Sequence, residues 1–489
     1  MGGVGAPAET ARRWQTVIGL EVHVELATRS KMFCRCSTAF GAPPNTQVCP
    51  VCLALPGSLP VPNRRAIELA LRAALALRCE IDPDCRWDRK NYHYPDLPKG
   101  YQITQYARPL GRGGELTFAG AGGASRTVRI RRLHMEEDTG KSTHEGMPGG
   151  ATGVDLNRAG VPLIEIVSEP DLRGPEDARL YLQALRLLLL YAGVSDVRME
   201  EGSLRCDANV SLRPAGSSEL GALVEIKNMN SFRSVQRALE YEEGRQAAAL
   251  DAGERIARET RHWDERRGIT FPSRSKEEAH DYRYFPEPDL GAVGLAPAFI
   301  EDTRRSLPEL PADRQARYEA LGLPGYDAGV LVADPALAAY FDRMLRAGAA
   351  AREGAALLSV ELLGRLNAAG IGVDSPECRV HPEQLAALQG LIASGSISGK
   401  IAKDVLDEML ATGSDPSVVV QRKGLQQISD QGAIGEAARA AIAANPQSVA
   451  DYRAGKKQAA DFLVGQVMKA TRGKANPGLV REAIARELG

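Results

Sequence analysis

Aromatic side chains, net charge and long apolar runs are all scarce in this 489-residue sequence. Aromatic residues make up 5% of the chain, and 61 Lys and Arg residues against 62 Asp and Glu residues give a formal net charge of −1. This balance argues against a protein that coats nucleic acid through bulk positive charge, although it leaves room for local basic patches. No apolar run approaches the ~18 residues of a membrane span, and residues 1–14 have no apolar core of signal-peptide type. We therefore expect a cytoplasmic protein without membrane contact, in which residues 1–14 form a short disordered leader.

The rest of the composition is typical of a folded globular protein. Hydrophobic residues make up 44% and charged residues 25% of the chain, which excludes bulk disorder, a collagen-like structure and a coiled coil. Up to about residue 293, strand-like alternation is mixed with Pro, Gly and charge, whereas Ala, Leu and Glu recur at helical spacing from Leu295 onward. We predict an α+β protein with a mixed, β-rich domain at 15–293, an all-α domain at 294–405 and an all-α tail domain at 406–489.

Two helices can be placed from local signals. Pro175 with the acids that follow it begins a helix that ends at Gly193, because proline and acids favour the first turn and glycine follows the last. Near the C-terminus, one apolar helical stripe is predicted from Ala459, Phe462, Leu463, Val467 and Ala470.

Residues 16–26 alternate between apolar and polar side chains. Because successive side chains of a strand point to opposite faces, Glu21, His23 and Glu25 share one face. Two carboxylates and an imidazole in a row suit a divalent cation. A solvated face of an antiparallel sheet explains the same pattern, so this strand alone leaves both interpretations open.

Three further segments carry charge in similar contexts. Residues 136–138 are three consecutive acids, and Glu165 lies inside an otherwise apolar strand, where a buried carboxylate needs a partner. Residues 203–213 alternate without a break, with Arg205 and Asp207 on the polar face. Each segment alone has the pattern of ordinary surface, but the four together predict a polar cleft lined by sheet residues.

Two short segments, 88–96 and 281–289, combine cations, tyrosines and acids. Such mixtures suit nucleotide or nucleic-acid binding through cation–phosphate pairing and stacking. Loops held in place by tyrosine hydrogen bonds are an equally good interpretation.

Four cysteines have the spacing of a metal site: Cys34, Cys36, Cys49 and Cys52. Four thiolates from two short loops fit tetrahedral zinc and leave no position open for water, which favours a structural ion over a catalytic one. The alternative is four reduced thiols without a metal.

The sequence resembles the B subunit of the glutamyl/aspartyl-tRNA amidotransferase family over nearly its whole length. The matching segments are 17–25, 88–92, 94–103, 134–138, 157–171, 199–209, 281–289, 399–403 and 462–471. The resemblance implies a "cradle" domain at the N-terminus that binds ATP and Mg²⁺ and phosphorylates the side-chain carboxylate of Glu or Asp misacylated on tRNA(Gln) or tRNA(Asn). Ammonia channelled from a separate amidase subunit would then form the amide.

The resemblance also implies partners and site residues. A small third subunit would brace the complex, the helical domains would hold the tRNA, and the non-discriminating aminoacyl-tRNA synthetase is a further candidate partner. The implied magnesium ligands are Glu21, His23, Glu137 and Glu165. The implied ATP-binding residues are Lys90, Asn91, Arg205 and Asp207, and the implied catalytic residues are Glu137, Lys90 and Arg205. The four cysteines match a zinc knuckle that only some family members have.

Two other functions remain as alternatives. One is a non-catalytic tRNA-binding scaffold, suggested by the tail, in which residues 451–489 contain eight Lys and Arg against four Asp and Glu. The other is a stand-alone ligase that uses free ammonia. A scaffold has no need for acids and an imidazole around one point, so their convergence decides between these hypotheses.

Overall fold

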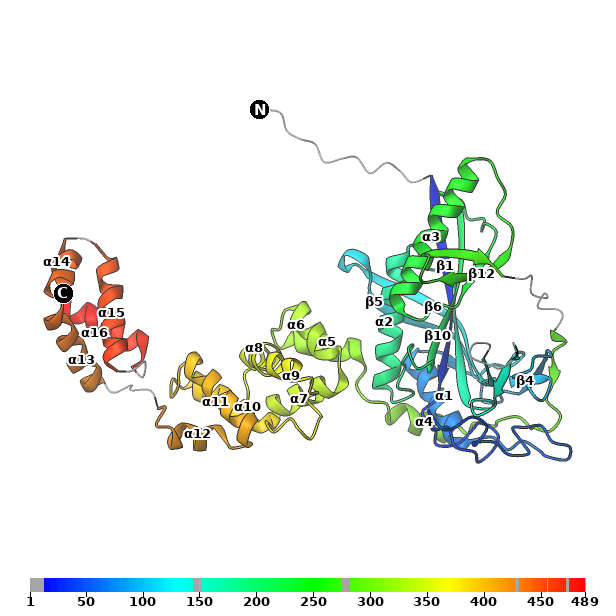
Figure 1. The fold of residues 1–489 in the computed structure, drawn as a ribbon, viewed down its shortest axis with the longest axis horizontal. Helices are drawn as coiled ribbons and strands as arrows, with labels where there is room; N and C mark the ends of the chain where they lie inside the picture. The colour runs from blue at the N-terminus through cyan, green and yellow to red at the C-terminus, as the bar shows by residue number, and fades with distance from the viewer. Residues whose placement is uncertain are drawn as a thin grey trace. The chain divides into compact units, whose positions relative to one another are not determined.

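The computed structural model describes residues 13–143, 149, 151–273, 282–426, 431–454, 456–471 and 475–488. It divides into two compact units, Met1–Ala312 and Asp313–Gly489 (Figure 1). Of the expected leader, residues 1–12 lie outside the described residues, and Trp14 already belongs to the first strand.

The first unit is built on one mixed sheet, which contains twelve strands within the described part of the chain. Its strands are β1 (Trp14–Glu25), β2 (Glu80–Ile81), β3 (Asp88–Asn91), β4 (Tyr101–Thr104), β5 (Gly111–Ala119), β6 (Ser125–Glu137), β9 (Pro162–Ser168), β10 (Leu204–Pro214), β11 (Val224–Lys227), β12 (Glu259–Asp264), β13 (Ile269–Pro272) and β14 (Phe285–Pro286). The main path runs β13-β12-β11-β10-β1-β9-β6-β4-β3-β14, while β5 pairs with β2 and β6. A separate pair, β7 (Lys141–Thr143) and β8 (Gly153–Asp155), is antiparallel, as are all the pairs of the large sheet except β11 with β12.

Helices cover one face of this sheet. They are α1 (Arg64–Ala76), α2 (Pro175–Tyr191) and α3 (Phe232–Asp251), with α4 (Pro297–Arg305) packed on α1, and a short 3₁₀ helix, η1 (Ala121–Gly123), beside α2. The strand side chains that face these helices are apolar and buried, such as Val22, Val24 and Ile164, each 0% exposed. Burial of this face stabilises the unit by removing apolar area from water, and the alternate side chains are left for the opposite face.

The strands and helix predicted from local signals are confirmed. β1 and β10 alternate as expected, and α2 begins at Pro175 and is followed by Gly193 in the left-handed region at φ +67°. The overall α+β class is also confirmed, since a β-rich unit precedes a helical one.

The second unit is helical throughout its described residues. Its helices are α5 (Pro311–Ala320), α6 (Gly325–Val332), α7 (Pro335–Arg346), α8 (Ala351–Ala356), the π-helical η4 (Leu357–Leu362), α9 (Leu363–Ala369), α10 (Pro382–Ala393), α11 (Gly399–Thr412), α12 (Pro416–Arg422), α13 (Gln431–Ala444), α14 (Pro446–Arg453), α15 (Gln458–Ala470) and α16 (Pro477–Leu488). No helix in the described part of the chain is long and apolar enough to cross a membrane.

The boundary predicted near residue 405 falls inside α11. This helix and α12 both pack against α10, so the chain continues the middle helical region past that position. A separate hydrophobic cluster first appears with Ile434 and extends to Leu488. The stripe predicted in α15 is only partly right, because Phe462 is 50% exposed while Val464 is buried. The division into domains at 15–293, 294–405 and 406–489 stays a prediction.

Candidate active site

The four polar segments identified in the sequence are neighbouring strands, in the order β10-β1-β9-β6. Their register places Arg205 opposite His23, His23 opposite Glu165, and Glu165 opposite His134. Directly opposite residues of paired strands share a face. One row of ionisable side chains therefore crosses the sheet on the face that is not covered by α1, α2 and α3.

Three side chains of this face form a candidate cation site. The ligand atoms of His23, Glu136 and Glu165 all lie within 4.8 Å of one another. His23 Nε2 lies 3.6 Å from Glu136 Oε1 and 3.9 Å from Glu165 Oε2. Glu136 is 3% and Glu165 is 7% exposed. Two buried carboxylates this close repel each other unless a cation lies between or beside them.

His134 and Lys90 supply positive charge to the two carboxylates. His134 Nε2 lies 3.1 Å from Glu165 Oε2 and 3.8 Å from Glu136 Oε2. Burial alone would lower the pKa of His134, but the neighbouring Glu165 and Glu136 outweigh it and the pKa is raised. The pKa of Lys90 is raised in the same way, against burial, chiefly by Glu136.

The two carboxylates are correspondingly held in their ionised form. Burial would raise the pKa of Glu165, but His134, His23 and Lys90 outweigh it, and the pKa is lowered. Burial also opposes the lowered pKa of Glu136, where a hydrogen bond from His134 is the largest favourable contribution. Ionised carboxylates are the form that binds a metal ion.

Glu21 lies beside this group on the same strand face as His23. Its Oε1 accepts a hydrogen bond of 2.9 Å from Asn209 Nδ2, and burial followed by repulsion from Glu165 raises its pKa. It does not belong to the set of ligand atoms within 4.8 Å. Glu21 therefore adjoins the candidate cation site.

The structure does not bring Glu137, predicted as a metal ligand, to this site. Glu136 and Glu137 are consecutive in β6, so their side chains leave opposite faces of the strand. Glu137 Oε1 accepts a hydrogen bond of 2.9 Å from the Ile103 amide and pairs with Lys99. It lines a separate cavity of about 260 Å³ together with Lys99 and Cys52. Alternation applied from His134 onward would have selected Glu136.

Arg205 lies at the edge of the cleft and is already paired. Its Nη2 donates a hydrogen bond of 2.7 Å to Asp138 Oδ2. Burial and the negative charge of Asp138 raise the pKa of the neighbouring Glu25 to about 8, with Arg205 acting in the opposite direction. Arg205 thus compensates the buried acids Asp138 and Glu25.

The other two predicted nucleotide contacts have partners within the protein. Asp207 pairs with Lys227, whose Nζ also lies 2.8 Å from Glu225 Oε1. Asn91 Nδ2 donates hydrogen bonds to the carbonyl oxygens of Tyr282 at 3.2 Å and Arg283 at 2.8 Å. Asn91 therefore positions the 282–286 segment.

The two tyrosine-rich segments meet in space. β14 pairs with β3 in antiparallel fashion, with Phe285 opposite Arg89. Lys90 Nζ lies 5.0 Å from the ring centroid of Tyr282 and 5.8 Å from that of Tyr92. Asp281, in the predicted segment, lies outside the described residues. Together the segments form an aromatic and cationic wall beside the carboxylates.

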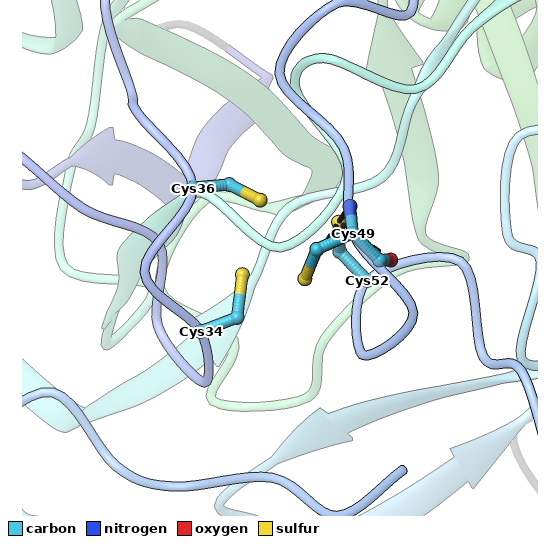
Figure 2. A group of neighbouring side chains, drawn as sticks. All are labelled: Cys34, Cys36, Cys49 and Cys52. Carbon is cyan, nitrogen blue, oxygen red and sulfur yellow. Dashed lines mark hydrogen bonds between the residues drawn. The ribbon is translucent and has the colours of Figure 1, made fainter.

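The four spaced cysteines converge from two loops, and their sulfur atoms lie within 4.8 Å of one another (Figure 2). Cys52 Sγ is 3.9 Å from Cys49 Sγ. Ligands at ~2.3 Å around a tetrahedral zinc ion stand about 3.8 Å apart, so the arrangement fits zinc. The hydrogen bond that Cys34 and Cys52 share lowers the pKa of Cys52 to about 4 and raises that of Cys34, as expected for one thiolate beside a neighbouring thiol. Cys206, by contrast, is buried in the core, as its place on the apolar strand face predicts.

Comparison with known proteins assigns both parts of the chain. Residues 16–301 match the model of the GatB/GatE catalytic domain, and residues 339–488 match that of the GatB domain. The aspartyl/glutamyl-tRNA(Asn/Gln) amidotransferase B subunit of Moorella thermoacetica is 55% identical over 477 residues, which cover 97% of this chain and 100% of that protein. Proteins of the same name from Carboxydothermus hydrogenoformans and Brevibacillus brevis are 53% and 52% identical, over 98% and 96% of this chain and 99% and 98% of their own.

Proposed function

The chain belongs to the family of aspartyl/glutamyl-tRNA amidotransferase B subunits, and from this premise we propose that its cleft carries out an ATP-dependent phosphorylation. The acceptor is the side-chain carboxylate of Glu or Asp attached to tRNA(Gln) or tRNA(Asn). A carboxylate oxygen attacks the γ-phosphorus and ADP leaves with the electron pair of the broken P–O bond. Ammonia then attacks the acyl carbon and displaces phosphate to give the amide.

The convergence of His23, Glu136 and Glu165 is the observation that carries this proposal. Their two carboxylates supply the hard oxygen ligands that Mg²⁺ prefers, and the imidazole is the third group. A magnesium ion there would neutralise charge on the transferred phosphoryl group. Glu21 extends the acidic wall, so it stays in the proposal as a neighbour of the site. Glu136 replaces Glu137 in it.

The cations of the cleft have a defined task in this reaction. The phosphoryl group and the acceptor carboxylate are both negative, so their approach requires positive charge on the protein. The negative charges of Glu136 and Glu165 act on Lys90, whose own charge is then available to a γ-phosphate. His134, held by Glu165, fixes the direction of that carboxylate. The burial of these groups keeps water from competing for the acyl phosphate.

The partners follow from the family. We propose that a separate amidase subunit supplies ammonia, that a small third subunit holds the complex together, and that the helical unit contacts the tRNA. The zinc knuckle, if filled as its geometry suggests, holds the two cysteine loops beside the cavity that Lys99 and Glu137 line. Glu136 and this cavity therefore lie on opposite faces of β6.

The test measures phosphoryl transfer alone. The assembled complex is given γ-labelled ATP, Mg²⁺ and Glu-tRNA(Gln) without glutamine, and ATP hydrolysis dependent on the charged tRNA is followed. Glu136→Gln and Glu165→Gln each remove one ligand charge, and we expect the rate to fall at least about 100-fold, since metal stabilisation of the transition state amounts to several kcal/mol. Glu137→Gln is the matched control on the opposite face of β6 and should keep the rate within about fivefold in this assay.

Equal rates in wild type and both ligand variants would contradict the proposal. They would favour the alternative of a tRNA-binding scaffold whose partner carries the chemistry. If only Glu137→Gln lowered the rate, Glu137 and not Glu136 would be the metal ligand.

A further inference from the structure

β6 contains a bulge just before the candidate active site. Ile130 pairs with Ser168 of β9, but Arg132 pairs with Val167, so Arg131 is an extra residue in β6. A β-bulge shifts the phase of a strand and re-aims the side chains that follow it.

The shift is visible in the buried residues. Before the bulge, Val128 and Ile130 face the helices, each 1% exposed, whereas after it Leu133 and Met135 do so, each 0% exposed. Arg132 therefore shares a face with His134 and Glu136. Without the extra residue it would face the apolar core together with Ile130.

Arg132 differs from its neighbours in having no acidic partner. Arg129 Nη2 lies 2.7 Å from Asp171 Oδ1, and Arg131 Nη2 lies 2.8 Å from Glu169 Oε2. Within the described part of the chain Arg132 makes no such ion pair, and its Nε is buried without a hydrogen-bond partner. An N–H group left in this state is costly, because it has given up water and gained nothing.

The guanidinium of Arg132 is nevertheless held in place. It lies 5.7 Å from the ring centroid of Tyr106, which stacks on Tyr284 with centroids 4.0 Å apart and planes 9° apart. Burial raises the pKa of Tyr284 to about 12, and the charges of Lys90, Glu136 and Arg132 all act on it. The stacked pair therefore joins Arg132 to the neighbourhood of the carboxylates.

We propose that Arg132 binds a phosphate group of ATP in the cleft, with the Tyr106–Tyr284 pair positioning its guanidinium. This rests on the function proposed above. A planar guanidinium binds phosphate with two parallel hydrogen bonds, and one that is already oriented loses little entropy on binding. Arg205 is paired with Asp138, and the charge of Lys90 already acts on Glu136 and Glu165. Arg132 makes no ion pair with a described residue and has a buried N–H without a partner, so it can satisfy a new anion.

The phosphate of a nucleotide can also come from the 3′ end of the tRNA, and two binding measurements distinguish the sources. The assembled complex is titrated with a non-hydrolysable ATP analogue and Mg²⁺, and separately with Glu-tRNA(Gln). We expect Arg132→Ala to weaken analogue binding roughly 10- to 150-fold, the equivalent of one hydrogen-bonded charged group, and to leave tRNA affinity within about twofold.

Two further variants complete the design. Arg131→Ala, in the same bulge but paired with Glu169, should change neither affinity by more than about twofold. Arg132→Lys keeps the charge without the planar fork, so it should weaken analogue binding less than Arg132→Ala does. It also replaces the alanine variant if that chain fails to assemble.

Three results would overturn the proposal. Unchanged analogue binding in both Arg132 variants removes the residue from the ATP site. A loss of tRNA affinity alone assigns the phosphate to tRNA. An equal loss in Arg131→Ala shows a general effect of the bulge. Each of these is separate from a failure of the phosphorylation proposal, which the Glu136 and Glu165 variants measure.

Discussion

Glu242 should be a costly carboxylate to remove from the first unit. It lies on α3 with 0% of its surface exposed, and its Oε1 is 3.0 Å from Nε of Arg261 on β12, which is itself 8% exposed. It also accepts hydrogen bonds from Arg245 at 2.9 Å, from Gln246 at 3.2 Å and from Thr270. Glu242→Ala would remove one of the two carboxylates that pair with the buried Arg261, the other being Glu259, whose Oε1 lies 2.9 Å from Arg261 Nη1. Breaking a buried pair from one side costs about 3–5 kcal/mol.

The assay is thermal or urea unfolding of the first unit within the intact chain, followed by tryptophan fluorescence, because Trp14, Trp87 and Trp263 all lie in that unit. The control is Glu240→Gln on the exposed side of the same helix, for which we expect a loss under about 0.5 kcal/mol. A loss below about 1 kcal/mol for Glu242→Ala would show that Arg261 finds water or another partner, and would refute the reasoning.

The pH dependence of this loss is a second measurement on the same pair of proteins. Burial opposes the lowered pKa of Glu242, but hydrogen bonds from Arg245 and Thr270 outweigh it, so the pKa lies below its ordinary 4.5. A carboxylate with a lowered folded-state pKa contributes stability that is present above the unfolded-state value and is lost as the pH falls through the folded-state value. The difference between wild type and Glu242→Ala should therefore stay constant at neutral pH and shrink only below about pH 4.5. A difference that already shrinks between about pH 8 and pH 6 would contradict a lowered pKa.

Two other predictions concern the cysteine loops and strand β5. Elemental analysis of the purified, reduced chain should find about one zinc ion. Cys49→Ser should lose this ion and Cys378→Ser should keep it. Wild-type protein without zinc would contradict the zinc knuckle. Gly114→Ala should destabilise the first unit by about 1–3 kcal/mol in the same unfolding assay. The reason is that a Cβ at this position would lie 2.5 Å from the carbonyl oxygen of Leu77. An unchanged stability would show that β5 can shift to make room.

The polar cleft could be predicted from the sequence because strict alternation determines which side chains share a strand face. Glu21 and His23 in β1, and Arg205 in β10, lie on the face where period two places them. That the four charged segments are adjacent strands depends on non-local pairing, which no local pattern contains. The expectation that these segments lie together rested on a charged residue in an otherwise apolar strand, such as Glu165, which requires a partner from another strand, and the four segments are neighbouring strands.

The resemblance implied Glu137 as a ligand, whereas the structure brings Glu136 to His23 and Glu165. The two residues are consecutive in β6, and consecutive residues of a strand face opposite ways. The boundary predicted near residue 405 falls inside α11, and the turn at 394–399 separates α10 from α11 without separating their packing. A turn signal indicates where a helix ends and not where a core ends.

The bulge in β6 is encoded directly in the sequence, as a change in which positions of the strand are apolar. Strict alternation along the strand would assign the wrong face to the residues after it. Apolar residues stand at even positions up to Ile130 and at odd positions from Leu133, and a single strand can keep both sets in one core only by absorbing an extra residue between them. Two consecutive arginines occupy that interval, and the pairing with β9 shows that Arg131 is the extra one. The phase change has a cost in ladder hydrogen bonds, which a purely structural strand would avoid. Its consequence is that His134 and Glu136 face the cleft at all, since an unbroken period from Ile130 would turn both toward the helices. The bulge and the candidate active site are therefore one feature, and a deletion of Arg131 should abolish phosphoryl transfer even where the chain still folds.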